Sequence, residues 1–366
     1  MERTYDIISD AQFGFRPGMS TINAMFTQHS IITKSFSNKK RLYCCFVDFQ
    51  KAFDRVDRIN LWFKLSKLGI RGKLLKLIKS LYGHVKSCVS LKGRISDFFD
   101  NEIGLFQGEI LSPILFSLYV NDFESFFISH CNSHYEFQDL SLFLMLYADD
   151  MVLFSETVHG LQDLLNNLEK YSDKWKLTVN TEKTKVVVFR KGGIVNGNEK
   201  WTYHGRDLDV VNEFIYLGIK FKFNNKFNNI QNQLSIQGRK AMFALFTKCN
   251  NMNLNVETLL HLFDTYVGSI LSYGCEVWGA SKANDIEKVH THFCKRILHV
   301  KKSTSNSMVY CELGRFPLEY YRKYRMIKYW FKLITARNCI LNRAYVFLRN
   351  CNTKKCFNWV TFIKKK

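Results

Sequence analysis

Residues Leu142 to Phe154 read Leu-Phe-Leu-Met-Leu-Tyr-Ala-Asp-Asp-Met-Val-Leu-Phe. Two adjacent carboxylates, Asp149 and Asp150, lie between two apolar runs. Each run has strand length and no helix stop signal, so the pattern predicts a β-hairpin with the acids at its tip. Carboxylates between apolar strands are costly unless cations neutralise them, which favours a Mg²⁺ site. A solvent-exposed turn is the alternative, because Asp is a common turn residue.

Another acidic position follows an apolar run nearer the N-terminus. The run Leu42–Val47 predicts a buried strand, and it ends on Asp48. Functional side chains often stand at the end of a buried strand. The same aspartate could instead cap the N-terminus of a helix, since a helical segment is predicted soon after, over Ile59–Leu68.

Residues 11–20 carry two glycines, a proline and an arginine, which predict a tight basic turn. A helix is expected to follow over Thr21–Phe36. In such a turn Arg16 could bind a phosphate with two hydrogen bonds, or it could lie in solvent.

A second glycine-containing loop precedes a predicted helix. Gln107 and Gly108 form the loop, and Ser112-Pro113 is a favourable helix start, with the helix expected to end near Phe127. A glycine loop lets the backbone approach a ligand closely, although an ordinary helix N-terminus has the same pattern.

The remaining segments predict a mixed α+β chain. Apolar periodicity predicts an amphipathic helix over Val158–Trp175. Short strands are expected over Leu177–Asn180, Lys185–Phe189 and, as a pair around Gly218, over Phe214–Phe221. From about Asn228 onward helical periodicity dominates and basic residues are spread along it.

Composition limits the class of protein. The 366 residues are 46% hydrophobic and 15% aromatic, which is typical of a chain with a packed core. The net charge of +21 favours a polyanionic partner, with an anionic membrane as the competing one. No apolar run approaches the roughly 20 residues that span a bilayer, and no signal-peptide pattern is visible. The 11 cysteines show no C-x-x-C pairs, so reduced thiols in an intracellular protein are expected.

Two groups of His and Cys residues are candidate zinc ligands. Neither has the ligand spacing of a zinc finger, so a connecting loop is favoured for the first group and packed or solvated side chains for the second. The groups are His130, Cys131 and His134, and His290, His292, Cys294 and His299.

Seven separated segments, taken in order, resemble the reverse transcriptases of non-LTR (LINE-type) retrotransposons, and the resemblance covers residues 1 to about 300. The segments are Gln12-Phe-Gly-Phe-Arg-Pro-Gly, Phe46-Val-Asp-Phe-Gln-Lys-Ala-Phe-Asp, Gly104-Leu-Phe-Gln-Gly-Glu-Ile-Leu-Ser-Pro, Tyr147-Ala-Asp-Asp, Asn180-Thr-Glu-Lys-Thr-Lys, Phe214-Ile-Tyr-Leu-Gly and Ser272-Tyr-Gly-Cys-Glu-Val-Trp-Gly.

The resemblance implies an α+β right-hand polymerase. We expect partial fingers and a palm with an antiparallel sheet over residues 1–225, a helical thumb-like region over 226–310, and a basic, aromatic, mainly helical C-terminal extension over 311–366. The implied activity is RNA-directed DNA polymerase, a nucleotidyltransferase that joins a deoxynucleotide to a primer 3′ hydroxyl with two metal ions. The implied partners are an RNA template, a DNA primer and dNTPs, with no membrane and an unassigned oligomeric state.

The resemblance also assigns catalytic residues. Asp48, Asp149 and Asp150 match the family's metal carboxylates, with Mg²⁺ as the expected ion and Mn²⁺ as a substitute. Lys183 matches the lysine that assists pyrophosphate departure, and Lys185 is the competing candidate.

Substrate-binding residues follow from the same resemblance. Arg16 matches a fingers arginine near the triphosphate. Phe53 matches the steric gate against a ribose 2′ hydroxyl, with a core position as the alternative. Gln107 and Gly108 match the loop against the templating base and incoming nucleotide. The primer grip is matched by Tyr216, Leu217 and Gly218.

The chain begins close to the Gln12 segment, so the resemblance implies an N-terminally truncated element without the earlier fingers motifs or an upstream endonuclease. The alternative function is therefore a catalytically inactive nucleic-acid-binding relic of a mobile element. Action in the nucleus is implied by integration into chromosomal DNA, although the sequence shows no clear targeting signal.

Overall fold

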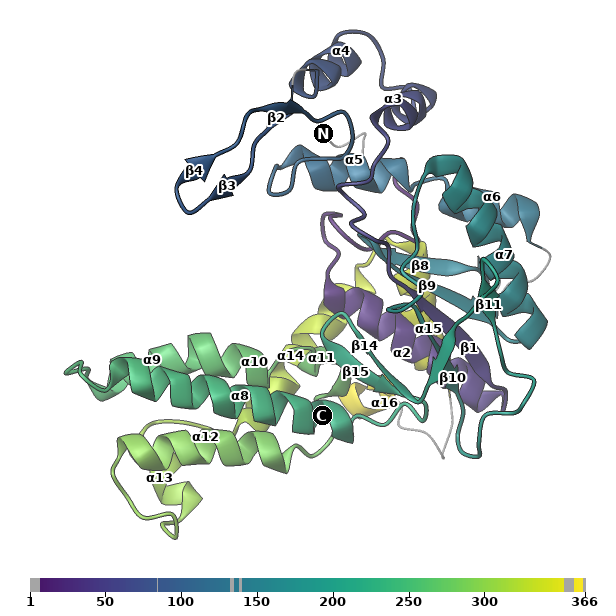
Figure 1. Cartoon of the computed structure of the whole chain (residues 1–366). Coiled ribbons are helices and arrows are strands. Elements are labelled where there is room, and N and C mark those ends of the chain that lie inside the picture. The colour runs from purple at the N-terminus through teal and green to yellow at the C-terminus, as the bar shows by residue number, and fades with distance from the viewer. Residues whose placement is uncertain (1–6, 84, 132–134, 138–139, 352–358, 365–366) are drawn as a thin grey trace. The chain divides into compact units, whose positions relative to one another are not determined.

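The computed structural model describes residues 7–83, 85–131, 135–137, 140–351 and 359–364 (Figure 1). The chain forms two compact units. The first contains Met1–Ala24 and Lys40–Val211, and the second contains Met25–Lys39 and Asn212–Lys366. Both units combine helices with strands, so the α+β prediction is confirmed. The residue boundaries expected for fingers, palm and thumb stay a prediction, because the division into two compact units does not identify these subdomains.

A five-stranded sheet forms the core of the first unit. Its order is β13-β10-β1-β9-β8, and every neighbouring pair is antiparallel except β10 and β13, which are parallel. The predicted antiparallel sheet is therefore confirmed with one parallel edge. The strands are β1 (Leu42–Val47), β8 (Leu144–Tyr147), β9 (Asp150–Ser155), β10 (Lys185–Phe189) and β13 (Asp209–Val211).

Helix α7 (Val158–Trp175) packs on this sheet through one apolar face, as its periodicity predicts. An Ncap hydrogen bond starts it, since the Thr157 hydroxyl accepts from the amide of Gly160 at 3.0 Å. The buried residues of the face are Leu161, Leu164, Leu165, Leu168, Tyr171 and Trp175.

The helix expected from Ser112 to about Phe127 is in fact two helices, α5 (Leu111–Tyr119) and α6 (Phe123–His130). A buried cation lies at the break. The buried ammonium of Lys64 donates to the carbonyl of Tyr119 and to the carboxylate of Asp122, both at 2.6 Å. A cation at the carbonyl end stabilises a helix terminus there. Lys64 lies on α3 (Arg58–Lys67), which α4 (Gly72–Leu81) follows.

The strand expected over Leu177–Asn180 does not form. Val179 makes only an isolated bridge to Phe49, because the chain there turns back towards the end of β1. Short two-stranded ladders complete the first unit: β2 (Lys86–Ser87) with β5 (Phe99–Asp100), β3 (Ser90–Leu91) with β4 (Arg94–Ile95), β6 (Tyr135–Glu136) with β7 (Ser141–Leu142), and β11 (Thr202–Tyr203) with β12 (Arg206–Asp207).

The second unit is mainly helical and contains one hairpin, β14 (Glu213–Tyr216) with β15 (Ile219–Lys222). Most of α2 (Thr21–Ser37) belongs to this unit, where Phe26 packs edge-on against the rings of Tyr329 and Trp359. No helix in the described part of the chain is long and apolar enough to cross a membrane. The other helices are α8 (Asn228–Cys249), α9 (Val256–Leu262), a π-helix (Phe263–Gly268), α10 (Ser269–Leu271), α11 (Cys275–Trp278), α12 (Asn284–Ile297), α13 (Asn306–Glu312), α14 (Leu318–Ile334), α15 (Cys339–Asn350) and α16 (Trp359–Lys364).

Candidate active site

The three predicted aspartates meet at one edge of the sheet. Tyr147 pairs with Asp150 across the β8–β9 hairpin, which leaves Asp149 in the two-residue turn. On the other side of β9, Val47 pairs with Met151, so Asp48 follows β1 at the edge where Asp150 begins β9. The predicted hairpin with acids at its tip is confirmed.

The helix-cap interpretation of Asp48 is wrong. The residue is separated from α3 by a turn, and the cap of α3 is Asp57, whose carboxylate accepts from the amide of Asn60 at 2.9 Å. The carboxylate of Asp48 is therefore not needed to start a helix.

The electrostatics of this edge are those of crowded negative charge. Burial, followed by the charge of Asp48, raises the pKa of Asp149 against the opposing effect of a backbone hydrogen bond. Burial, then Asp149 and Asp48, raises the pKa of Asp150 from 3.8 to about 6. Among the described residues, none of the three carboxylates forms an ion pair with a basic side chain. A cation would relieve this repulsion.

The aspartates do not make a closed cage by themselves. Within the described ranges, no group of three or more His, Cys, Asp or Glu side chains is arranged so that it could hold a metal ion without further ligands. Mg²⁺ sites that act on phosphates usually take one or two carboxylates and complete their coordination with water and substrate oxygens. The donor chemistry at this edge therefore fits Mg²⁺ held together with a phosphate-bearing substrate.

A turn before β10 holds the backbone of Asp48. The amide of Asn180 donates to the Asp48 carbonyl at 2.7 Å, and the Asp48 amide donates to the hydroxyl of Thr184 at 3.1 Å. Lys183 stands in this turn with an exposed side chain, whereas Lys185 forms an ion pair with Asp209. Lys183 is thus the neighbour of Thr184, which holds the backbone of Asp48. The ammonium group of Lys183 is accessible to solvent.

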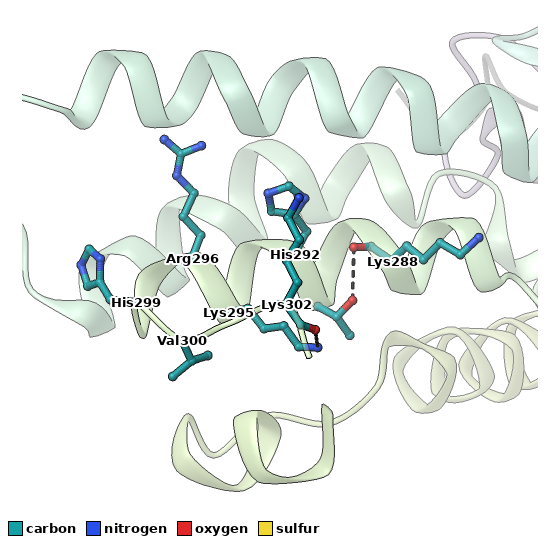
Figure 2. Close-up of a pocket in the computed structure, with 8 residues that line it drawn as sticks. Lys288, His292, Lys295, Arg296, His299, Val300 and Lys302 are labelled. Atoms are coloured by element: carbon teal, nitrogen blue, oxygen red, sulfur yellow. Dashed lines mark hydrogen bonds between the residues drawn. The ribbon is translucent and has the colours of Figure 1, made fainter. Parts of the chain in front are cut away.

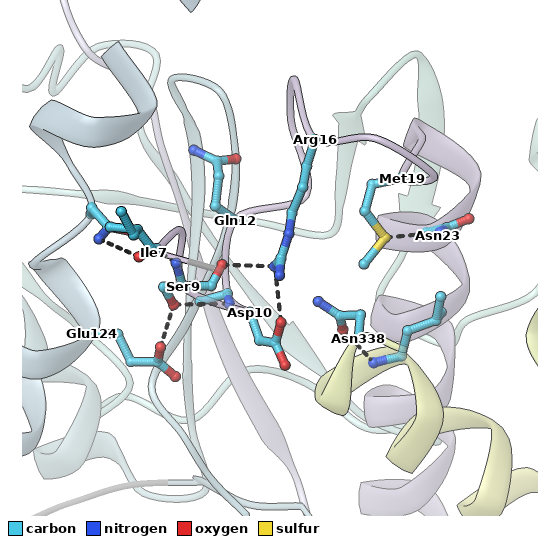
Figure 3. A network of polar contacts seen from close by, with 12 residues as sticks. Ile7, Ser9, Asp10, Gln12, Arg16, Met19, Asn23, Glu124 and Asn338 are labelled. Carbon is cyan, nitrogen blue, oxygen red and sulfur yellow. Dashed lines mark hydrogen bonds and ion pairs between the residues drawn. The ribbon is translucent and has the colours of Figure 1, made fainter. Parts of the chain in front are cut away.

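Arg16 does not lie free in solvent. Its guanidinium donates to the Ser9 carbonyl at 3.1 Å and to the Asp10 carboxylate at 2.9 Å, and its side chain is only 17% exposed (Figure 3). The solvated alternative is wrong for this residue. The network continues from Ser9 to Glu124 and Asn121, which fixes the basic turn to α6 and to the loop before it.

Phe53 and the glycine loop pack together. The ring of Phe53 is half-buried and stacks on Phe116 with centroids 4.6 Å apart, and its carbonyl accepts from Leu105 at 2.8 Å. Gln107 donates to the carboxylate of Asp54 at 2.8 Å. Gly108 next to it has a φ of 87°, which favours glycine. Both predicted loop residues therefore lie beside the segment that follows Asp48.

Tyr216, Leu217 and Gly218 belong to the second unit, where they end β14 and form its hairpin turn. Leu217 and Gly218 have φ values of 48° and 80°, as a two-residue hairpin turn requires. The hydroxyl of Tyr273 donates to the Leu217 carbonyl at 2.8 Å, so two of the quoted sequence segments meet at this turn.

A basic hollow of about 520 Å³ lies along α12 and the loop after it in the second unit (Figure 2). Burial, followed by the charges of Lys302, Arg296 and Arg239, lowers the pKa of His292, which reflects the positive field. The residues that line the hollow are Lys288, Thr291, His292, Lys295, Arg296, His299, Val300 and Lys302.

The second group of His and Cys residues agrees with the packed or solvated interpretation. His290 and Cys294 are buried in the core, while His292 and His299 line the basic hollow. His130, which was expected in a connecting loop, is instead the last residue of α6 and stacks on Phe126 with ring centroids 4.1 Å apart. His134 lies outside the described residues.

Sequence reasoning missed the residues that hold the site in place. Gln12 and Gly14 contact the tip of the acidic hairpin, Asn180 and Thr184 hold Asp48, and Tyr273 holds the Leu217 turn. Each lies inside one of the quoted segments. Their polar or small side chains at those positions were the available signal.

A known protein family matches the first three-fifths of the chain. The family model described as reverse transcriptase (RNA-dependent DNA polymerase) matches residues 1–221. That range contains the whole five-stranded sheet and the three aspartates.

Curated relatives are mobile-element polymerases. The chain is 28% identical over 289 residues to the probable RNA-directed DNA polymerase from transposon BS of Drosophila melanogaster, covering 76% of this chain and 31% of the relative. It is 25% identical to the RNA-directed DNA polymerase from mobile element jockey of the same organism, covering 79% and 31%. The chain thus spans about a third of these relatives.

Solved structures give a more distant likeness. Telomerase from Candida albicans, in complex with a fragment of telomeric RNA, matches 96% of this chain and 55% of its own at 12% identity and a TM-score of 0.42.

Proposed function

This chain belongs to the reverse transcriptase (RNA-dependent DNA polymerase) family, and we propose that it adds deoxynucleotides to a primer 3′ hydroxyl on an RNA template. The observation that carries the proposal is the convergence of Asp48, Asp149 and Asp150 at one sheet edge, where no basic side chain of the described chain neutralises them. Such acids, far apart in sequence, suit the metal-assisted transfer of a phosphoryl group.

Asp48 and Asp149 would hold two Mg²⁺ ions, with Asp150 supporting the site and Mn²⁺ as a substitute ion. When bound, the ions supply Lewis acidity at the attacking and leaving oxygens. The raised pKa values of Asp149 and Asp150 support this proposal, because they report carboxylates whose charge lacks a partner.

Lys183 is proposed to donate a proton to the departing pyrophosphate. Its exposed side chain favours it over Lys185, which is held by Asp209. An ammonium in this position stabilises negative charge that develops on the leaving group.

Binding roles are proposed for the residues around the glycine loop. Arg16 would exchange its Asp10 partner for the triphosphate, Phe53 would fill the space of a 2′ hydroxyl, and Gln107 with Gly108 would lie against the base pair being formed. The stacking of Phe53 on Phe116 supports a gate role, because a ring held on one side cannot easily move aside.

The template and primer would be bound by the second unit. Tyr216, Leu217 and Gly218 are proposed to position the primer terminus. The basic hollow along α12 offers ammonium and guanidinium groups for phosphates, so binding would weaken as salt rises. Integration of the DNA product would require action in the nucleus.

The test is primer extension on an RNA template by the chain and by its Asp149→Asn variant, with Mg²⁺ and dNTPs. We expect extension by the parent, a loss of at least about a hundredfold in the variant, and equal salt-sensitive template–primer binding by both. If neither chain extends the primer while both bind it, the inactive nucleic-acid-binding alternative is correct. Loss of binding in the variant would instead indicate a folding defect.

A further inference from the structure

We propose that Gln12 and Gly14 are positioning residues that hold the tip of the acidic hairpin, and with it Asp149, in the orientation that binds the metal ion. The proposal deepens the proposed polymerase function and rests on it. Neither residue touches substrate, and both would act through the main chain of Ala148.

Gln12 is 1% exposed and binds the turn directly. Its side-chain oxygen accepts from the amide of Ala148 at 3.0 Å and from the amide of Gly14 at 2.8 Å. Its side-chain nitrogen donates to the Ala148 carbonyl at 3.4 Å, a longer contact. One amide side chain therefore binds both sides of the residue that precedes Asp149.

The turn needs such support because its sequence does not favour it. Ala148 has a φ of 60°, a region that residues with a side chain rarely adopt. Asn and Gly are the usual residues in two-residue hairpin turns, and neither occurs here. The hydrogen bonds from Gln12 therefore stabilise a turn that its own residues do not favour.

Gly14 provides an independent observation. A Cβ atom at this position would lie 2.3 Å from the Ala148 nitrogen and 3.0 Å from the Tyr147 carbonyl carbon. Both are backbone atoms of the hairpin, so a side chain would displace the tip itself. The φ of Gly14 is not positive, and close approach alone accounts for the glycine.

The segment that carries these residues is fixed against β8. The Leu146 amide donates to the Ala11 carbonyl at 2.8 Å, and the Phe13 amide donates to the Leu146 carbonyl at 2.7 Å. Arg16 stands four residues after Gln12, held by Asp10 (Figure 3). One short segment therefore connects the proposed triphosphate-binding arginine to the backbone beside Asp149.

A residue buried in this way could also act only through fold stability, and metal binding separates the two roles. We would measure Mn²⁺ binding by electron paramagnetic resonance in the full chain with template–primer. The variants are Gln12→Met, which keeps the size of the side chain and removes its hydrogen bonds, and Gly14→Ala. Gly192→Ala is the matched control, because a Cβ there meets nothing within 4 Å.

We expect both variants to bind Mn²⁺ about tenfold more weakly or worse, as when residues that orient metal ligands are replaced. The Mg²⁺ concentration that half-saturates extension should rise by a similar factor, and the control should match the parent. Thermal unfolding without metal identifies the folded variants, and Gln12→Asn replaces Gln12→Met if the latter does not fold.

Folded variants that bind Mn²⁺ like the parent, with only a lower melting temperature, would overturn the proposal. A different result tests the underlying function. If the parent binds no Mn²⁺, or if Asp149→Asn binds it as tightly as the parent, the metal site itself is refuted whatever Gln12 does.

Discussion

Replacing Asp150 by Asn should make the metal-free chain more stable. The pKa of Asp150 is raised because burial and the charges of Asp149 and Asp48 oppose its ionisation in the folded state. In the unfolded chain these neighbours are distant. The folded state therefore bears a cost for the charged carboxylate, and the neutral amide of similar shape removes that cost.

The magnitude follows from the two pKa values. A change from 3.8 to about 6 corresponds to about 3 kcal/mol if the group were shielded from solvent. The carboxyl group is only partly buried, since residue Asp150 as a whole is exposed at the start of β9, so screening reduces the expected gain to about 1 kcal/mol. For a chain of 366 residues the melting temperature should rise by about 1–2 °C.

The sign of the pH dependence is fixed by the raised pKa. Above about 6 the carboxylate is charged in both states, so the parent bears the full cost; below 3.8 it is protonated in both and the cost is absent. The parent should lose stability relative to Asp150→Asn as pH rises through this window, and the advantage of the variant should vanish at its acidic end.

The assay is thermal unfolding with a chelator across that pH range, followed by addition of Mg²⁺. Mg²⁺ should stabilise the parent more than the variant, because a ligand stabilises the state that binds it. Asp97→Asn, at an exposed aspartate between β4 and β5, is the control and should change little. A variant no more stable than the parent, or an advantage that grows towards acid, would refute the crowded-carboxylate reasoning.

Two further predictions concern substrate handling. Phe53→Val should raise the use of ribonucleotides relative to deoxynucleotides by about tenfold or more in single-nucleotide incorporation; a loss of stability with an unchanged ratio would make the Phe53–Phe116 stack a core contact only. Lys183→Ala should slow single-turnover incorporation by about a hundredfold, whereas Lys185→Ala should have little effect because its ion pair with Asp209 is at the surface; equal losses in the two variants would remove the assignment of Lys183.

Elements with strong local patterns could be predicted from the sequence. The helix over Val158–Trp175 and the strand over Lys185–Phe189 have the predicted limits, since their periodicity depends on neighbouring residues alone. The break between α5 and α6 could not be predicted. The Lys64 ammonium, which stabilises the end of α5 there, comes from 55 positions away in the sequence.

The same distinction applies to the site. Asp48, Asp149 and Asp150 could be found because each acid interrupts or ends an apolar run. The hydrogen bond between Gln12 and Ala148 joins residues 136 positions apart. No periodicity or turn signal in the sequence specifies that pairing. The two residues come together only when the sheet has folded.

The way the acids are held argues for a cation site over a structural cluster of carboxylates. Asp48 is fixed through its amide and carbonyl by Thr184 and Asn180, and Asp149 is fixed through the backbone of its neighbour by Gln12. Structural aspartates are normally held through their carboxylate oxygens, as Asp57 is by Lys176 and the amide of Asn60, and their pKa then falls. Asp149 and Asp150 have raised pKa values instead. A fold that fixes the main chain while leaving the carboxylate oxygens without basic partners in its described part supports the proposal that these acids bind a metal ion.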